Sequence, residues 1–150
     1  MFEGASALTL DSKGRMSVPT AYRALKKENG DGNVVVTLDK DDSCLLLYTE
    51  FEWKVVQEKL SKLPSFNEHT RKLMRIIVGH ASKVKMDGNN RILIPPLLRE
   101  IVNIDKSIAL IGMTNKFEIW DEQTWARKLE EMKSKEISDE VPLEIATLSI

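Results

Sequence analysis

Two stretches of this sequence decide the fold: ASALTLDSKGRMSVPTAYRAL, residues Ala5–Leu25, and ASKVKMDGNNRILIPPLLREI, residues Ala81–Ile101. They align without a gap at a constant offset of 76 positions. Identical residues occupy six of these positions, Ala5/Ala81, Ser6/Ser82, Asp11/Asp87, Arg15/Arg91, Pro19/Pro95 and Arg23/Arg99. Apolar residues match at Leu8/Val84, Leu10/Met86, Met16/Ile92, Val18/Ile94 and Leu25/Ile101. An ungapped agreement of this length indicates an internal duplication.

The duplication continues into a second pair of segments. LLLYTEFEW at Leu45–Trp53 corresponds to FEIWDEQTW at Phe117–Trp125, now at an offset of 72, so a loop of the first copy is expected to be longer by four residues. Alternating apolar residues predict strands, and polar turn-forming segments predict hairpins that join 34–38 to 45–48 and 108–113 to 117–120. The order predicted for each copy is strand, loop, strand, short helix, strand, turn, strand, helix.

Helix starts are marked in both copies. Pro19 and Pro95 end the second strand of each copy and suit the first turn of a short helix. Thr49, with a glutamate three residues later, forms a capping box that opens a helix ending near residue 64. Asp121 is expected to cap the equivalent helix of the second copy.

A further helix is predicted between the two copies, over about 67–78. Ser65 marks its start and Gly79 its end, and beyond about Ile137 the pattern fades into a tail that is expected to be loose. The sequence therefore predicts a first repeat at 5–53, linking helices at 54–80, a second repeat at 81–125, and a C-terminal helix with an acidic tail at 126–150.

The composition is that of a folded globular protein, with 150 residues, 42% of them hydrophobic and 30% charged. No apolar run approaches the roughly 20 residues that a membrane helix needs. The first residues lack the basic and apolar regions of a secretory signal, so none is expected. Cys44 is the single cysteine, which excludes an intrachain disulfide and favours a cytoplasmic protein.

The net charge of −1 argues against a uniformly basic nucleic-acid binder, but the charges are distributed unevenly. Residues 1–27 hold five basic and two acidic side chains, and residues 68–91 hold six basic and two acidic ones. Residues 121–150 hold eight acidic and four basic side chains. Positive charge therefore gathers around the two duplicated segments, whereas the C-terminal arm is acidic.

Both copies carry an Asp-x-x-x-Arg loop, Asp11 to Arg15 and Asp87 to Arg91. An aspartate at the end of a strand can accept hydrogen bonds from amides of the following turn. The arginine four residues later begins the returning strand, and its guanidinium is expected to project outward. A planar guanidinium with five donors suits phosphate oxygens or the O6 and N7 of guanine. Two such loops on one chain would form a pseudo-twofold pair that contacts DNA.

The same loops hold small, polar and basic residues. The candidate DNA contacts are Arg15, Arg91, Lys13, Asn89 and Asn90, and the candidate loop-structuring residues are Asp11, Asp87, Gly14 and Gly88. The alternative is that each Asp-Arg pair only stabilises its own turn and does not contact DNA. We favour that structural role for the two aspartates and DNA contact for the two arginines. Packing or salt bridging is expected for Arg23 and Arg99, which follow in the short helices.

These motifs resemble the MraZ family. The resemblance is carried by LDSKGRMSVP at 10–19, GHAS at 79–82, MDGNNRILIP at 86–95, CLLLY at 44–48 and NKFEIW at 115–120. It runs from Met1 to at least Trp125 with the motifs in order. One departure is Asn90, which stands where the first copy has Gly14. Because asparagine tolerates the left-handed conformation, the turn is expected to survive, and the two loops are free to contact DNA unequally.

The resemblance implies an α+β fold of two tandem AbrB-like swapped-hairpin β-barrel halves, forming a pseudo-dimer with flanking helices. It implies a nucleoid-associated bacterial transcriptional regulator that acts at the promoter of the division and cell-wall gene cluster, its own gene included. Such proteins assemble as closed rings and bind short direct repeats of double-stranded DNA. The family's DNA-contacting loop arginine corresponds to Arg15 and Arg91, with Lys13 beside the first. Trp53, Trp125 and Phe66 are candidates for contacts between subunits, although core packing is the commoner fate of such residues.

The same residues bear on two other classes of function. An enzyme is disfavoured, because the sequence holds no phosphate-binding glycine loop, nucleophile elbow or metal motif, and neither a cofactor nor a small-molecule substrate is predicted. His69 and His80 are expected to be a surface residue and a turn residue, and Cys44 a buried thiol. The alternative to DNA binding is an antitoxin-like protein-interaction module, with the acidic tail from Ile137 as its binding arm. Solvated disorder is the competing expectation for that tail.

Overall fold

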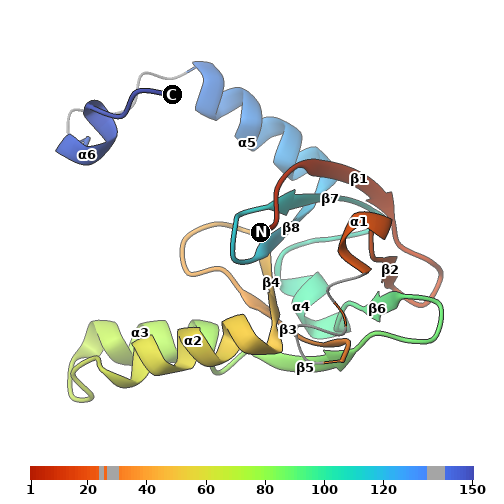
Figure 1. Ribbon diagram of the computed structural model, residues 1–150, viewed down its shortest axis with the longest axis horizontal. Coiled ribbons are helices and arrows are strands. Elements are labelled where there is room, and N and C mark those ends of the chain that lie inside the picture. Colours follow the sequence, from red (N-terminus) through yellow and green to blue (C-terminus); the bar gives the residue numbers. More distant parts are fainter. Residues whose placement is uncertain (24–25, 27–30, 135–140) are drawn as a thin grey trace.

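The computed structural model describes residues 1–23, 26, 31–134 and 141–150 and shows the predicted element order twice (Figure 1). The first repeat contains β1 (Ala5–Thr9), β2 (Arg15–Ser17), α1 (Thr20–Arg23), β3 (Asn33–Leu38), β4 (Leu45–Thr49) and α2 (Glu50–Ser61). The second contains β5 (Ser82–Lys85), β6 (Arg91–Leu93), α4 (Pro96–Ile101), β7 (Ser107–Gly112), β8 (Phe117–Asp121) and α5 (Glu122–Ser134). Helix α3 (Glu68–Ile77) links the repeats, and α6 (Leu143–Ala146) follows α5.

The strands form two antiparallel sheets. Six strands lie in the order β1-β7-β8-β4-β3-β5, and β2 pairs with β6 in a separate two-stranded sheet. The first strand of each repeat pairs with the third strand of the other, β1 with β7 and β5 with β3. The expectation of a barrel is wrong, because the described strands form these two sheets and no closed barrel. The short strands β2 and β6 pair with each other and do not join β1 and β5, which remain the edges of the large sheet.

A local pseudo-twofold axis passes between Met16 and Ile92, which face each other in the β2–β6 pair. These residues are equivalents under the offset of 76, so the pair maps onto itself. The same offset converts the neighbouring residue pair Arg15–Leu93 into the pair Ser17–Arg91. It also relates two hydrogen bonds, one from Val18 N to Asn90 O (2.9 Å) and one from Ile94 N to Gly14 O (3.0 Å). The duplication thus places equivalent segments of the two repeats directly against each other.

The four extra residues of the first copy do not lie in one loop. Val34 of β3 pairs with Val84, and Ile108 of β7 pairs with Leu8, so β3 and β7 correspond at an offset of 74. Strands β2 and β6 correspond at an offset of 76 residues, and strands β4 and β8 correspond at an offset of 72 residues. The first copy therefore has two extra residues between β2 and β3 and two more in the β3–β4 turn. The expectation of a single longer loop is therefore wrong. Both insertions fall in connections, where they leave the strand register unchanged.

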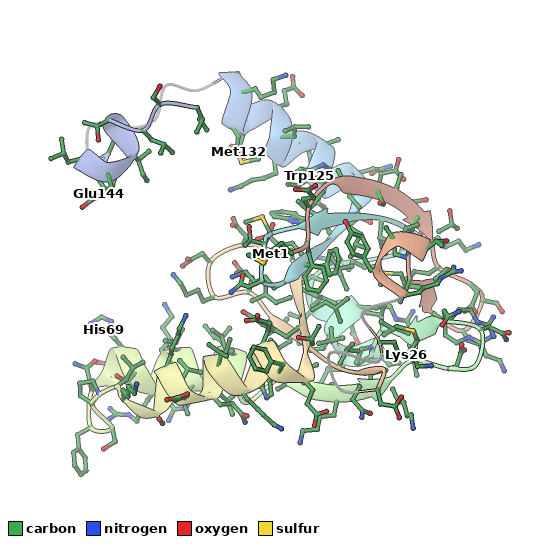
Figure 2. The ribbon with its side chains drawn as sticks, viewed as in Figure 1. Met1, Lys26, His69, Trp125, Met132 and Glu144 are labelled. Carbon is green, nitrogen blue, oxygen red and sulfur yellow. The ribbon has the colours of Figure 1, made fainter. Side chains whose placement is uncertain are left out.

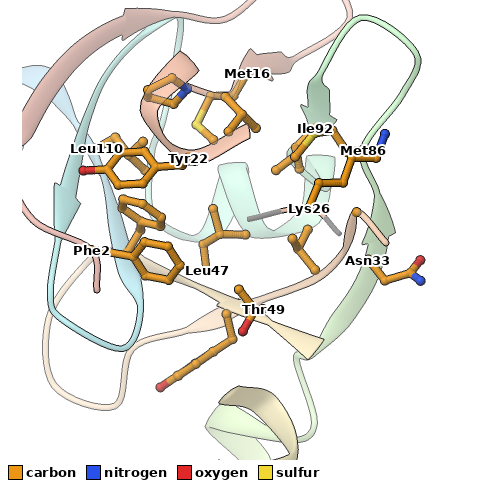
Figure 3. A pocket seen from close by; sticks show the side chains of 16 residues that line it. Phe2, Met16, Tyr22, Lys26, Asn33, Leu47, Thr49, Met86, Ile92 and Leu110 are labelled. Carbon is orange, nitrogen blue, oxygen red and sulfur yellow. The ribbon is translucent and has the colours of Figure 1, made fainter. Parts of the chain in front are cut away.

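The main core lies between the large sheet and the layer formed by β2, β6, α1 and α4. Met16 and Ile92 are buried at its centre. The sheet contributes alternate residues to this core, Val36, Leu38, Leu45, Leu47, Ile108, Leu110, Phe117 and Ile119. A cavity of about 50 Å³ lies inside it, lined mainly by apolar side chains such as Phe2 and Met86 (Figure 3). This is far below the roughly 300 Å³ or more of ordinary ligand pockets.

Helices cover the outer face of the large sheet in two places. Helices α2 and α3 lie over β3 and β4, where Val35, Leu46, Tyr48, Trp53 and Ile77 pack together. Helix α5 lies over β7 and β8, where Trp125 packs against Trp120 with the ring centroids 5.4 Å apart. Because these four strands are covered on both faces, their residues are buried almost continuously instead of alternating.

The helices begin at the predicted caps with one correction. Thr49 accepts a hydrogen bond from the third backbone N–H of α2 at 3.2 Å, and Asp121 accepts one from the third backbone N–H of α5 at 3.3 Å. Helix α3 is capped by Asn67, whose side chain accepts from the second N–H of the helix at 2.8 Å, and not by Ser65. Asparagine and serine cap helices about equally well, so the sequence pattern alone did not separate them.

The predicted loose tail falls partly on residues 135–140, which lie outside the described residues, as does Leu25, the predicted equivalent of Ile101. Beyond residue 140, the tail carries the four-residue helix α6, whose side chains are exposed. None of the helices in the described ranges is long and apolar enough to cross a membrane.

Candidate nucleic-acid interface

The first Asp-x-x-x-Arg loop is a tight turn held by one carboxylate. Asp11 Oδ1 accepts hydrogen bonds from the backbone N–H groups of Lys13 and Arg15, both at 2.9 Å. Asp11 Oδ2 accepts a hydrogen bond from Arg15 Nε at 2.7 Å. Gly14 has a left-handed conformation (φ +82°), which glycine adopts without a steric penalty. The turn therefore fixes the direction of the Arg15 side chain.

The second loop has the same geometry. Asp87 Oδ1 accepts hydrogen bonds from the backbone N–H groups of Asn89 (2.8 Å) and Arg91 (3.0 Å), and Asp87 Oδ2 accepts one from Arg91 Nε (3.2 Å). Asn90 has φ +59° at the position equivalent to Gly14. Asparagine is among the residues that tolerate this region, so its replacement of glycine leaves the turn intact.

The two loops meet at the pseudo-twofold axis and form a charge quartet of Asp11, Arg15, Asp87 and Arg91. Arg15 Nη1 lies 3.9 Å from Asp87 Oδ2, and Arg91 Nη1 lies 3.4 Å from Asp11 Oδ2. Figure 1 shows the β1–β2 and β5–β6 loops side by side at one end of the molecule, away from the α2–α3 hairpin and α5. Sequence reasoning missed these contacts between the loops. The constant offset through both segments was the available signal that equivalent residues would meet at an axis.

Hydrogen bonds keep both carboxylates of the quartet ionised. The backbone N–H of Arg15 is the main cause that lowers the pKa of Asp11 from 3.8 to about 2, and the Arg15 side chain adds to it. The backbone N–H of Arg91 is likewise the main cause that lowers the pKa of Asp87. At neutral pH, the quartet therefore combines two carboxylates and two guanidinium groups, with no net charge.

The two arginines are less exposed than the sequence suggested. The side chains of Arg15 and Arg91 are 27% and 30% exposed, because each guanidinium lies against two carboxylates instead of projecting freely. The contacts in the quartet involve Nε and Nη1 of each arginine. Since a guanidinium has five N–H donors, each arginine retains capacity for an external oxygen atom.

The exposed tips of the two loops differ in chemistry. Lys13 and Asn89 occupy equivalent positions, and both are exposed. Gly88 is exposed, whereas Asn90 is partly buried and its backbone carbonyl accepts the hydrogen bond from Val18 N. The tips therefore offer a cation on one side of the pseudo-twofold axis and an amide on the other.

Arg23 and Arg99 pack against the backbone, as expected from their place in the short helices. Arg23 Nε donates to the carbonyl of Val18 at 2.8 Å, and Arg99 Nε donates to that of Ile94 at 3.0 Å. The Arg99 guanidinium also lies over Gly14, where an added Cβ would come within 2.5 Å of Arg99 Cζ. Gly14 thus provides space for Arg99 as well as the left-handed turn, a requirement that the sequence did not reveal.

The histidines and the cysteine lie where the sequence placed them. His69 is exposed on α3, and His80 lies in the turn after that helix, with Nδ1 2.8 Å from a carbonyl of its last turn. Cys44 is fully buried, and burial raises the pKa of its thiol above the usual value, which keeps it protonated.

One group of side chains has the composition of a metal site. Ligand atoms of Asp39, Cys44 and Glu118 lie within 4.8 Å of one another. Asp39 already accepts two backbone N–H groups of the β3–β4 turn, at 3.1 and 2.7 Å, and Glu118 accepts Trp120 Nε1 at 3.0 Å. Asp39 Oδ2 and Glu118 Oε1 therefore already accept hydrogen bonds within the β3–β4 turn and β8.

Comparison with protein families gives two matches to one family, described as "MraZ protein, putative antitoxin-like", at residues 1–76 and 77–143. The chain belongs to the MraZ family. The two matches adjoin, so the MraZ family description applies to each copy of the duplication in turn. The resemblance carried by the loop motifs is thereby confirmed.

Relatives in the MraZ family align over nearly the whole chain. The protein named Transcriptional regulator MraZ from Legionella pneumophila (strain Corby) is 41% identical over 152 residues, which cover 100% of both chains. That of Enterobacter sp. (strain 638) is 48% identical over 139 residues, 93% of this chain and 91% of the relative. That of Shewanella baltica (strain OS185) is 45% identical over 141 residues, 94% of this chain and 93% of the relative.

Proposed function

We propose that this chain is a sequence-specific DNA-binding transcriptional regulator that contacts DNA through its two Asp-x-x-x-Arg loops. The observation that carries the proposal is the charge quartet, which links Arg15 to Asp87 and Arg91 to Asp11 where the two loops lie side by side at one end of the molecule. Pairs of oriented guanidinium groups suit phosphates and guanine edges. The name shared by the relatives, Transcriptional regulator MraZ, supports the same function.

The quartet suggests how DNA would engage the arginines. The contacts within each loop are 2.7 and 3.2 Å long, whereas those between the loops are 3.9 and 3.4 Å long. A phosphate that approaches the pair is therefore expected to displace the longer contacts first. Arg15 and Arg91 would keep their Nε bonds and their direction, and would offer their Nη groups to DNA. Because the arginines are held in place beforehand, little side-chain entropy is lost on binding.

The loop tips would add unequal contacts. Lys13 is suited to a phosphate, because an exposed ammonium group binds it as a point charge. Asn89 is suited to a base edge, where its amide can form two hydrogen bonds to adenine. Asn90 is a further proposed contact, and Asp11, Asp87, Gly14 and Gly88 are proposed to shape the loops. The two halves of the pseudo-twofold surface would therefore make different contacts with bound DNA.

One pair of loops is expected to bind DNA only weakly, so we further propose a homo-oligomer that acts as a closed ring on short direct repeats. Several pairs that engage successive repeats gain affinity through effective concentration. The proposed target is the promoter of the division and cell-wall gene cluster, including the protein's own gene, and the proposed location is the nucleoid in the cytoplasm. The proposed parts are AbrB-like swapped-hairpin halves at 5–53 and 81–125, linking helices at 54–80 and a C-terminal arm at 126–150.

The test is fluorescence anisotropy with DNA from upstream of the protein's own gene and with a shuffled fragment of equal length, over a salt series. We expect the protein to bind the upstream fragment more tightly than the shuffled one. The logarithm of the affinity should fall linearly with the logarithm of the salt concentration, by about 0.9 for each neutralised phosphate. Equal affinity for both fragments at every salt concentration would contradict it.

A second candidate is an antitoxin-like protein-interaction module, which the description of the family as antitoxin-like favours. In that case, the acidic C-terminal tail would bind a basic partner protein. The test is deletion of residues 137–150. Loss of a protein partner that co-purifies with the full chain, with DNA binding unchanged, would support this candidate, and retention of the partner would count against it.

A further inference from the structure

An arginine of the second repeat lies against the Asp-x-x-x-Arg loop of the first. Ile94 N donates a hydrogen bond to Gly14 O at 3.0 Å, which fixes the segment before α4 beside the first loop. Arg99 of α4 reaches back along this segment, and its Nε donates to Ile94 O at 3.0 Å. The guanidinium of Arg99 then lies over Gly14. Arg99 thus belongs to the second repeat in sequence and to the first loop in space.

The terminal nitrogens of Arg99 have no hydrogen-bond acceptor within the described part of the protein, unlike those of its equivalent, Arg23. Arg23 Nη2 donates to Ser17 Oγ at 3.3 Å. At the offset of 76, Leu93 stands where the first repeat has Ser17, so the second repeat offers no hydroxyl group at this position. Nη1 and Nη2 of Arg99 therefore donate to none of the described residues, and only Nε is engaged. Figure 2 shows the loops with their side chains at the end of the molecule away from α5.

A second difference between the repeats allows Arg99 to approach its loop closely. A Cβ added at Gly14 would lie 2.5 Å from Arg99 Cζ and 2.7 Å from Arg99 Nη2. The second loop has Asn90 at the equivalent position, and its Cβ prevents Arg23 from lying over that loop at the same distance. The first loop therefore has a guanidinium directly over its backbone, and the second loop has not.

Three cations gather around the first loop, and only one of them is neutralised within the described residues. Arg15 lies against the carboxylates of Asp11 and Asp87 in the charge quartet. Lys13 and Arg99 form no ion pair with any carboxylate that the structure describes. Lys13 is exposed, whereas Arg99 is half-buried, so its unused N–H groups are only partly hydrated. An anion beside the first loop would supply the missing acceptors and neutralise both cations.

We propose that Arg99 binds a phosphate of the DNA backbone beside the first loop, through Nη1 and Nη2, while Nε stays bound to Ile94 O. The anchored side chain cannot extend toward the floor of a DNA groove, whereas phosphates line the rim of the groove that the loop would enter. Arg99 would fix the position of the first loop on the duplex, and Arg23 would remain a structural residue. This contact deepens the proposed function and rests on it.

The test compares Arg99→Gln with Arg23→Gln, because both residues make the same backbone hydrogen bond in equivalent helices. Anisotropy is measured over a salt series with the upstream fragment and the shuffled fragment, and urea unfolding checks the fold. Arg99→Gln should weaken binding to both fragments by the same factor. Its salt slope should fall by about 0.9 for each bound chain, as expected for one lost phosphate contact. Arg23→Gln should keep the wild-type slope.

Arg99→Lys is the second variant, and it keeps the charge if Arg99→Gln fails to fold. Because an ammonium group also binds a phosphate, Arg99→Lys should keep the wild-type slope and most of the affinity. Loss of discrimination at one base pair in Arg99→Lys would show a base contact and overturn the phosphate contact. An unchanged slope in folded Arg99→Gln, or equal losses in Arg99→Gln and Arg23→Gln, would also overturn it. Failure of the proposed function is distinguishable, because it would appear in wild type as equal affinity for both fragments. Wild type that binds no DNA would overturn both.

Discussion

The guanidinium of Arg91 lies 3.4 Å from the carboxylate of Asp11, a residue 80 positions earlier in the chain. This contact and its counterpart between Arg15 and Asp87 link the loops of the two repeats. Each arginine therefore faces one carboxylate in its own turn and another across the pseudo-twofold axis. The pair of loops behaves as one electrostatic unit, so a change in either loop should affect both.

Asp11 should make stability depend on pH in the acid range. Its pKa is lowered from 3.8 to about 2 in the folded protein, so the folded state favours the ionised form. Its contribution to the free energy of unfolding is then fully present above about pH 4, and is lost as the pH falls through about 2. Wild type should lose more stability than Asp11→Asn between about pH 5 and pH 2. Urea unfolding at several pH values measures this, and identical pH profiles would show that Asp11 does not stabilise the fold through its charge.

Gly14→Ala should destabilise the fold, although alanine is a small residue. An added Cβ would lie 2.5 Å from Arg99 Cζ, and φ +82° is unfavourable for alanine. The expected cost is about 1–3 kcal/mol in the free energy of unfolding, measured by urea denaturation. Asn90→Gly at the equivalent position is the control, with an expected change below about 1 kcal/mol. Equal effects of the two substitutions would mean that neither the left-handed backbone nor the contact with Arg99 requires glycine at position 14.

Lys13→Ala and Asn89→Ala should affect DNA binding in different ways. Loss of the Lys13 ammonium group should weaken binding to all sequences and reduce the salt slope by about 1. Loss of the Asn89 amide should leave the slope unchanged and reduce discrimination between bases, by about 1–3 kcal/mol at one position. Binding measured on a set of single-base operator variants at several salt concentrations separates the two effects. The same change in both variants would contradict the unequal roles of the two tips.

Much of the fold could be predicted from the sequence, because the duplication constrains both copies at once. The strands, the hairpins and the helix starts at Thr49 and Asp121 follow from local patterns that recur at a fixed spacing. The division of the four-residue insertion could not be predicted, since turns tolerate added residues without a change in the apolar pattern. The open arrangement of the two sheets depends on how β2 and β6 pair, which is a tertiary property.

Only part of the candidate site could be predicted from the sequence. The spacing of Asp11 and Arg15 is local, so the hydrogen bonds of the turn follow from it. The exposure of Arg15 does not follow, because it depends on Asp87 of the other repeat. The packing of Arg99 over Gly14 joins residues that are far apart in the chain, and no local pattern marks it.

The most direct test of DNA binding by the loops is the operator affinity of wild type, Arg15→Ala, Arg91→Ala and the double variant, measured by anisotropy with circular dichroism as the check on folding. Lys40→Ala with Lys54→Ala, which removes two charges far from the loops, is the matched control. Each single variant should lose about 1–3 kcal/mol, and the double variant should lose its preference for the operator over shuffled DNA. A folded double variant that binds the operator as tightly and as selectively as wild type would show that the loops do not contact DNA.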